Sequence, residues 1–136
     1  MLALLCMARE RGCRLSELTN DLPHRFTASD RLQNFAIEVS HALIARLSAD
    51  WAYIDDLMAP DSGEVMNVDT TDGLRVTFAN GDIVHLRPSG NAPELRCYAE
   101  ADTQERAQDR CNACLQRVLS SHAVIVSEAI QGVAAK

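Results

Sequence analysis

The sequence changes from helical to strand periodicity between residues 65 and 100, and this change constrains the fold more than any other feature of the 136 residues. Apolar and polar side chains alternate through Leu74–Phe78, Ile83–Arg87 and Leu95–Glu100. A period of two predicts strands that bury one face, and the order of the strands predicts an antiparallel meander. A further short strand is expected at Val65–Asp69, followed by a turn at Thr71-Asp72-Gly73.

Side-chain parity predicts the register of one hairpin. A two-residue Asn80-Gly81 loop would place Val76 beside His85 and would split the apolar face. A three-residue loop, Ala79-Asn80-Gly81, pairs Val76 with Val84 and keeps the apolar side chains together. It also puts a glycine at the left-handed position that such loops favour. The three-residue loop is therefore preferred.

Two helices are expected to flank the strands. Residues 31–48 and 103–122 both carry apolar side chains at intervals of three and four. Each has candidate capping residues at its start: Ser29 or Asp30, and Asp102 or Thr103. Residues 50–62 between them are expected to form a turn of helix and then a loop. The prediction is an α+β fold, an antiparallel sheet of about four strands with helices packed on one face.

The two ends of the chain are expected to lie outside this unit. Residues 1–12 predict an apolar helix that Gly12 ends, and Ser16 can cap a second short helix that Pro23 closes. An apolar helix that opens a chain abruptly is either the tail of a preceding domain or a helix of the same domain, and both interpretations stay open on the residues alone. The tail from Ser127 has low complexity and is expected to fray.

Composition excludes some classes of function. The net charge of −6 is unfavourable for a nucleic-acid surface, which needs clustered lysine and arginine. The five cysteines are odd in number and have no disulfide-like spacing, which indicates reduced thiols. The apolar start, Met1–Ala8, has no basic segment before it and is too short to cross a bilayer. A cytoplasmic protein with no nucleic-acid or membrane partner is therefore expected.

The segment Arg87–Arg96 is the one that carries chemistry. It reads Arg-Pro-Ser-Gly-Asn-Ala-Pro-Glu-Leu-Arg and connects two strands with more residues than a hairpin needs. Guanidiniums, a serine hydroxyl and successive backbone N–H groups at Ser89, Gly90 and Asn91 together suit a tetrahedral oxyanion. The alternative from residue chemistry alone is a glycine- and proline-rich turn with two surface arginines.

This segment resembles the phosphate-binding loop of the α-D-phosphohexomutase superfamily, roughly Arg-x-Ser-(Gly or Asn)-Thr-Glu-Pro-x-x-Arg. Asn91 and Ala92 depart from it, since they stand where the family usually has Thr and Glu. The strand Leu95–Ala101 is similar to the family's Leu-Arg-Val-Tyr-Val-Glu-Ala, and Leu15–Thr27 is similar to its link between the third and fourth domains. The resemblance covers most of the chain, from about residue 1 to residue 120. The loop residues that match, in order, are Arg87, Ser89, Gly90, Pro93 and Arg96.

The resemblance implies the fourth, C-terminal domain of a phosphomannomutase or phosphoglucomutase, with a fold like that of the TATA-box-binding protein. Such isomerases interconvert hexose 1-phosphate and 6-phosphate through a bisphosphate, and the fourth domain clamps the phosphate that is not transferred. The nucleophilic serine and the Mg²⁺ loop belong to other domains of the same enzyme. This chain is therefore expected to bind the phosphate of mannose or glucose phosphate, to need no cofactor of its own and to catalyse nothing alone. The residues implied for phosphate binding are Arg87, Ser89, Gly90, Asn91 and Arg96.

The resemblance also implies domain limits. Residues 1–28 would be the tail of the third domain with the interdomain linker, residues 29–124 the phosphate-binding domain, and residues 125–136 a flexible tail. A free-standing α+β module that binds an anion or a protein, with no catalytic activity, is the competing hypothesis. A Cys111-x-x-Cys114 metal or redox site is also conceivable, but both cysteines fall on the apolar stripe of a predicted helix, which favours small buried thiols.

Overall fold

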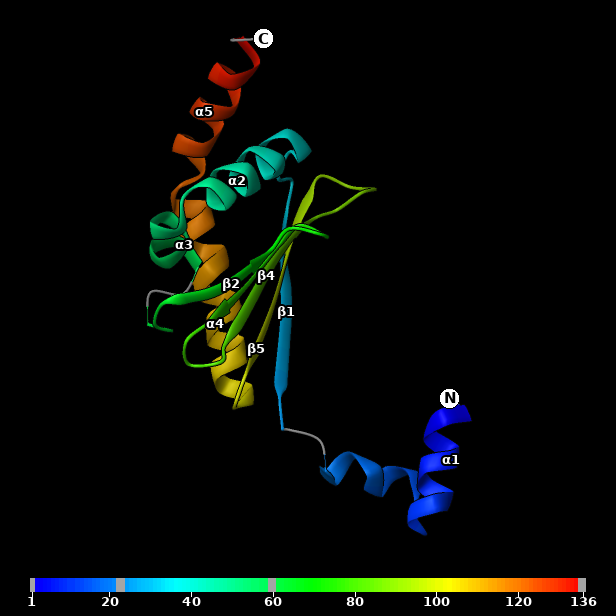
Figure 1. Ribbon diagram of the computed structural model, residues 1–136. Coiled ribbons are helices and arrows are strands. Elements are labelled where there is room, and N and C mark those ends of the chain that lie inside the picture. The colour runs from blue at the N-terminus through cyan, green and yellow to red at the C-terminus, as the bar shows by residue number, and fades with distance from the viewer. Residues whose placement is uncertain (1, 22–23, 59–60, 135–136) are drawn as a thin grey trace.

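One antiparallel sheet of five strands, in the order β1-β5-β4-β3-β2, organises the chain. The computed structural model describes residues 2–21, 24–58 and 61–134. Helices cover one face of the sheet and leave the other face open (Figure 1), so the α+β prediction is confirmed with one strand more than expected. The strands are β1 (Phe26–Gln33), β2 (Val65–Asp69), β3 (Leu74–Phe78), β4 (Ile83–Pro88) and β5 (Glu94–Ala101).

The predicted register of the β3–β4 hairpin is confirmed. Val76 pairs with Val84, and the Phe78 N–H donates to the Asp82 carbonyl oxygen at 2.9 Å, which closes the three-residue loop. Gly81 has a φ of 84°, the left-handed conformation that glycine adopts without a steric penalty. Because side chains alternate along a strand, this register sends Leu74, Val76, Phe78, Val84 and Leu86 to the helix-covered face and leaves Ile83 on the other face.

Strand β1 is the main departure from the sequence prediction. Residues 31–33 were expected in a helix and residues 26–28 in a linker, but all six lie in β1, which pairs along its whole length with β5. The helix begins only at Ile37, because Asn34 takes a left-handed φ of 57° that no continuous helix can contain. Neither Ser29 nor Asp30 caps it, so the capping prediction was wrong here. Pairing with β5 outweighed the local periodicity.

The helices of the covered face are α2 (Ile37–Ala49), α3 (Trp51–Met58) and α4 (Gln104–Ser120). Thr103 caps α4 as predicted, accepting the Arg106 N–H at 3.2 Å. Each large aliphatic side chain that is fully buried contributes about 1.5–3 kcal/mol relative to an exposed one. The fully buried side chains of the core include Leu43, Leu47, Ile54, Met58, Leu74, Val76, Phe78, Val84, Leu86, Leu95 and Val118.

The C-terminal segment is helical rather than frayed. Helix α5 (His122–Ala134) follows α4 directly, and Ile125 is 1% exposed within the core. The His122 ring packs edge-on against Phe35, with 5.3 Å between the ring centroids. The prediction of a flexible tail from residue 125 was therefore wrong over the described residues, because low complexity concealed an apolar side that packs near α2.

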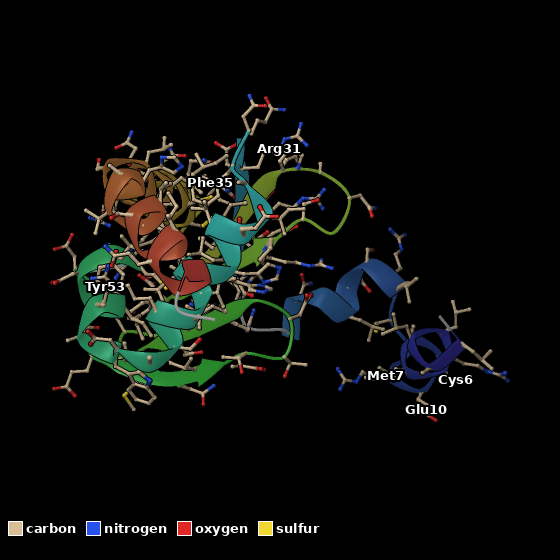
Figure 2. All side chains as sticks on the ribbon, turned by 90° about the horizontal axis from the view of Figure 1, so that it is seen from above. Cys6, Met7, Glu10, Arg31, Phe35 and Tyr53 are labelled. Carbon is tan, nitrogen blue, oxygen red and sulfur yellow. The ribbon has the colours of Figure 1, made fainter. Side chains whose placement is uncertain are left out.

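The N-terminal elements stand apart from the sheet. Helix α1 (Leu2–Arg11) and the 3-10 helix η1 (Leu15–Asp21) form a unit of their own beside the body of the molecule (Figures 1 and 2). Gly12, with a φ of 61°, ends α1 as predicted. Ser16 lies inside η1 rather than at its cap, and Pro23 is outside the described residues. Among the described residues, no helix is both long and apolar enough to cross a lipid bilayer.

Candidate functional site

The loop between β4 and β5 is fixed at both ends by backbone hydrogen bonds. The Ser89 N–H donates to the Glu94 carbonyl oxygen at 2.9 Å, and the Phe35 N–H donates to the Pro93 carbonyl oxygen at 2.9 Å. Because the Ser89 N–H is used in the first of these bonds, it is not free to join the predicted anion nest. The prediction that the Ser89 N–H belongs to the nest was wrong. A Cβ atom built on Gly90 would meet nothing within 4 Å, and both Gly90 and Asn91 are exposed. The tip of the loop therefore leaves room for a ligand to approach the backbone.

Arg87 and Arg96 lie directly opposite each other on neighbouring strands, on the open face of the sheet. The Nε atom of Arg87 is 3.1 Å from Oδ1 of Asp72. Arg96 lies 3.7 Å from the Glu94 carboxylate, the pairing that was considered for it from the sequence. Both arginine side chains remain more than 40% exposed, at 46% and 41%, so these ion pairs are weak and do not saturate the guanidinium donors.

Ser89 lies in a cavity of about 500 Å³ at the end of the sheet near α2. The cavity is lined by the loop residues Pro88, Ser89 and Gly90, by the β2–β3 turn and by His41 of α2. Ser89 is 6% exposed. Neither Arg87 nor Arg96 lines this cavity, so the serine and the guanidiniums do not share one pocket in the described residues. Asp72 is the link between the two groups, because it lines the cavity and binds Arg87.

The β2–β3 turn is pressed against β4 at the position of Arg87. Gly73 has a φ of +85°, and a Cβ on it would lie 2.3 Å from the Leu86 carbonyl oxygen and 3.0 Å from Cα of Arg87. Only glycine fits such a contact. The carbonyl oxygen of Asp72 is also bonded to Nε2 of His85. The turn therefore places Asp72 in the lining of the Ser89 cavity and pairs it with Arg87, which lies outside that lining.

His41 is a cavity residue that the sequence analysis did not select. It lies in α2, one turn from Ile37 and about one turn from Ile44, and all three line the cavity. The helical spacing of these residues placed His41 on a helix, but only the packing of α2 over the β2–β3 turn shows which face of the helix meets the loop. Helical periodicity in the sequence does not show how a helix packs against a distant turn.

The Cys111-x-x-Cys114 pair lies in the core between α4 and β5, beside Cys97. The Cys111 thiol donates to the Cys97 carbonyl oxygen at 3.5 Å. Hydrogen bonding with Cys111 and Cys114, together with burial, raises the pKa of Cys97 and keeps it a neutral thiol. Within the described ranges, no group of three or more His, Cys, Asp or Glu side chains is arranged to hold a metal ion.

An α+β sheet whose end carries an exposed, arginine-bearing loop held by a glycine turn is the class of domain that these features define. Residues 37–116 match the family model described as "Phosphoglucomutase/phosphomannomutase, C-terminal domain". The chain belongs to this family, and the resemblance inferred from the sequence is confirmed.

Curated relatives agree with this membership. The chain is 42% identical over 119 residues to the phosphomannomutase of Salmonella muenchen, a match that covers 88% of this chain and 24% of that protein. It is 44% identical over 110 residues to the phosphomannomutase of Sinorhizobium fredii, covering 79% of this chain and 23% of that protein. The chain thus spans about a quarter of the length of these relatives. Among solved structures, the open form of the Paramecium phosphoglucomutase parafusin aligns with 85% of this chain and 22% of its own, at 16% identity and a TM-score of 0.41.

Proposed function

We propose that this chain is the phosphate-clamping domain of a phosphomannomutase/phosphoglucomutase that interconverts hexose 1-phosphate and hexose 6-phosphate through a bisphosphate. The observation that carries the proposal is the contact between the Asp72-Gly73 turn and β4. It holds Arg87 beside Asp72, and Asp72 lines the cavity that contains Ser89 and Gly90. The 136 residues alone bind phosphate weakly and catalyse nothing.

In this proposal the substrate phosphate is bound by Arg87, Ser89, Gly90, Asn91 and Arg96. The Ser89 hydroxyl and the exposed backbone at Gly90 and Asn91 approach the anion from the loop. Arg87 reaches it from outside the cavity lining, by exchanging its partly exposed contact with Asp72 for a phosphate oxygen. Charge-assisted hydrogen bonds of this kind contribute about 1.5–3 kcal/mol each. Arg96, opposite Arg87, adds positive charge to the same edge.

The role of such a clamp is positioning. Holding one phosphate of a hexose phosphate orients the other end of the sugar for in-line phosphoryl transfer. The charge of the bound anion also favours closure of the cleft around it. The substrate is mannose or glucose phosphate, and the partners are the remaining domains of the same cytoplasmic enzyme. The Mg²⁺ of that enzyme is bound by its second domain, outside the 136 residues.

The proposal extends to the domain limits. In this proposal the residues before the sheet belong to the third domain and the linker. The sequence predicts a phosphate-binding domain at residues 29–124, and because β1 begins at Phe26 we propose Phe26 as its start. Since Ile125 packs in the core, the domain also includes at least the first turn of α5.

The test is a titration of the ¹⁵N-labelled chain with inorganic phosphate, followed by amide chemical shifts. The amides of residues 89–91 are expected to shift, and Ser89→Ala and Arg87→Ala are expected to weaken the effect several-fold. Arg75→Ala is the matched control, because Arg75 lies on the same open face but pairs with Glu100 at 3.1 Å. Unshifted loop amides would refute the clamp, and measurable hexose phosphate isomerisation by the chain alone would refute the claim that it is not catalytic.

A second test uses the full-length enzyme. Arg87→Ala is expected to raise KM more than it lowers kcat, because the lost contact with phosphate exists in both the ground state and the transition state. Unchanged kinetics would remove Arg87 from the site.

A further inference from the structure

Three arginines form one row across the open face of the sheet. In the strand register, Arg31 of β1 lies opposite Arg96 of β5, and Arg96 lies opposite Arg87 of β4. Neighbouring strands are about 4.8 Å apart, so the three side chains leave the sheet from adjacent positions on the same face. Arg31 enters the row only because residues 26–33 form a strand.

This row is electrostatically unfavourable without a counter-charge. Like charges directly opposite each other in a sheet are destabilising, and here the repulsion occurs twice. Asp72 partly compensates Arg87 at 3.1 Å. Glu94 is shared between Arg31 at 3.6 Å and Arg96 at 3.7 Å. The last two distances exceed those of hydrogen bonds, so the donors of Arg31 and Arg96 remain available to another acceptor.

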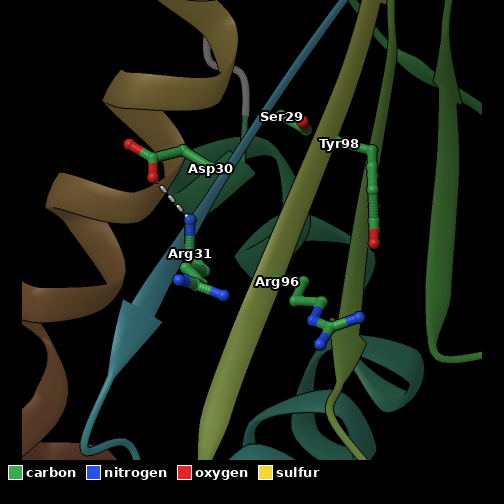
Figure 3. Close-up of a pocket in the computed structure, with 5 residues that line it drawn as sticks. All are labelled: Ser29, Asp30, Arg31, Arg96 and Tyr98. Carbon is green, nitrogen blue, oxygen red and sulfur yellow. Dashed lines mark hydrogen bonds between the residues drawn. The ribbon is translucent and has the colours of Figure 1, made fainter.

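A cavity of about 420 Å³ lies at this pair, lined by Ser29, Asp30, Arg31, Arg96 and Tyr98. Figure 3 shows Arg96 and Tyr98 pointing away from α4, whereas Asp30 points toward that helix. The Asp30 carboxylate accepts the backbone N–H of Arg31 at 2.8 Å. Ser29 and Tyr98 pair with each other across the strands, so the same cavity is lined by two neutral hydroxyl groups and two guanidiniums.

We propose that this cavity is a second oxyanion site, in which Arg31 and Arg96 bind a phosphate group and Ser29 and Tyr98 donate hydrogen bonds to it. The site differs from the loop cavity that contains Ser89, since the two cavities share no lining residue. It goes beyond the proposed function, with which it has only Arg96 in common. A local conflict between like charges in a sheet is expected where a ligand resolves it.

The experiment separates this site from the loop by using one residue that belongs to each. The labelled 136-residue chain is titrated with inorganic phosphate, and a parallel titration with KCl matches the ionic strength. Amides of residues 29–31 and 96–98 are expected to shift with phosphate and not with KCl. Arg31→Ala is expected to weaken this response about tenfold, the loss of roughly one charge-assisted contact, and to leave the response of residues 89–91 within about twofold.

Two further variants complete the design. Ser89→Ala is expected to show the reverse pattern, weakening the loop response and sparing residues 29–31. Arg75→Ala, on the same face and paired with Glu100, is expected to change neither response. Arg31→Lys keeps the charge but loses the bidentate fork, so its effect is expected to be intermediate. The amide spectrum of each variant without phosphate reports whether it is folded.

Several results would overturn the second site. The site does not exist if the amides of residues 29–31 stay unshifted, if KCl reproduces their shifts, or if folded Arg31→Ala binds phosphate there as tightly as the wild type. None of these outcomes bears on phosphate binding by the loop, which would be refuted by unshifted amides at residues 89–91. Glucose 6-phosphate is expected to shift both groups of amides, because its phosphate group offers the same charge and acceptors.

Discussion

Replacement of Asp82 by alanine is expected to lower the free energy of unfolding by about 2–4 kcal/mol. The Asp82 side chain is 2% exposed. Its Oδ2 atom accepts hydrogen bonds from the Ser62 hydroxyl at 3.1 Å and the Asn80 amide at 3.0 Å. The same oxygen accepts from Nε of Arg106 at 3.0 Å and Nε of Arg110 at 3.1 Å. One carboxylate thus ties the β3–β4 loop, the residues before β2 and helix α4 together.

The magnitude follows from what the substitution leaves behind. Removing one partner of a buried ion pair typically costs about 3–5 kcal/mol, because the other charge stays buried. Here the Arg110 side chain is 14% exposed and Arg106 is 36% exposed, so water can reach Arg106 and the loss is smaller. For a chain of this size, such a loss lowers Tm by roughly 8–16 °C.

The assay is urea unfolding followed by circular dichroism. Asp102→Ala is the matched control, because Asp102 also pairs with Arg106, at 3.9 Å, but is 66% exposed. Its loss is expected to cost less than about 0.5 kcal/mol. If both substitutions lower the free energy of unfolding by the same small amount, burial does not explain the contribution of Asp82, and the argument is refuted.

The same carboxylate predicts a pH dependence. Burial opposes ionisation of Asp82, but the hydrogen bonds from Ser62 and Asn80 and the charge of Arg106 outweigh it, so the pKa of Asp82 lies below its ordinary value of 3.8. Ionised Asp82 therefore stabilises the fold fully above that ordinary value, and the contribution is lost as pH falls through the lower folded-state pKa. The stability difference between wild type and Asp82→Asn should be constant from about pH 7 to 5 and shrink below about pH 4.

Three further outcomes can be checked with the same chain. Gly73→Ala is expected to cost more than about 2 kcal/mol in urea unfolding because its Cβ would strike backbone. Gly81→Ala, with a similar φ of +84° but open surroundings, should cost only about 1 kcal/mol; equal losses would contradict the steric argument. Thr103→Ala removes the cap of α4 and should cost about 1 kcal/mol, measured by thermal unfolding. A thiol reagent should modify exposed Cys6 and half-buried Cys13 in the native chain, and a third fast-reacting thiol would contradict burial of the others.

The sheet could be predicted where local pattern and tertiary environment agree. In β3, β4 and β5 the alternating apolar residues all face the helices, so the period of two seen in the sequence is the burial pattern itself. Parity alone also selected the correct hairpin loop, because the wrong register would have exposed Val76 or buried His85. In these strands, the side chains themselves show which face is buried.

Strand β1 could not be predicted in this way because its side chains carry little of that signal. Only Ala28 is buried in its eight residues, and Leu32 and Phe35 fit helical spacing as well as any other. It is held by the backbone ladder with β5 and by packing against α4, and both of these are non-local. Helix α5 was not predicted for a related reason: it packs against α2, which lies more than 70 residues away in sequence.

The candidate site combines both situations, and this explains which of its residues were found. Arg87, Ser89 and Arg96 are visible because they lie in one continuous loop segment, where composition alone indicates an oxyanion. His41 and Arg31 are brought to the same end of the sheet by α2 and β1, from regions whose sequence gives no hint of chemistry. The error in β1 therefore concealed a functional candidate as well as a strand: on a helix, Arg31 is one more solvated charge, and on β1 it stands beside Arg96. Where a strand is held by pairing rather than by its own pattern, the charges that it carries have to be sought in the register of the sheet.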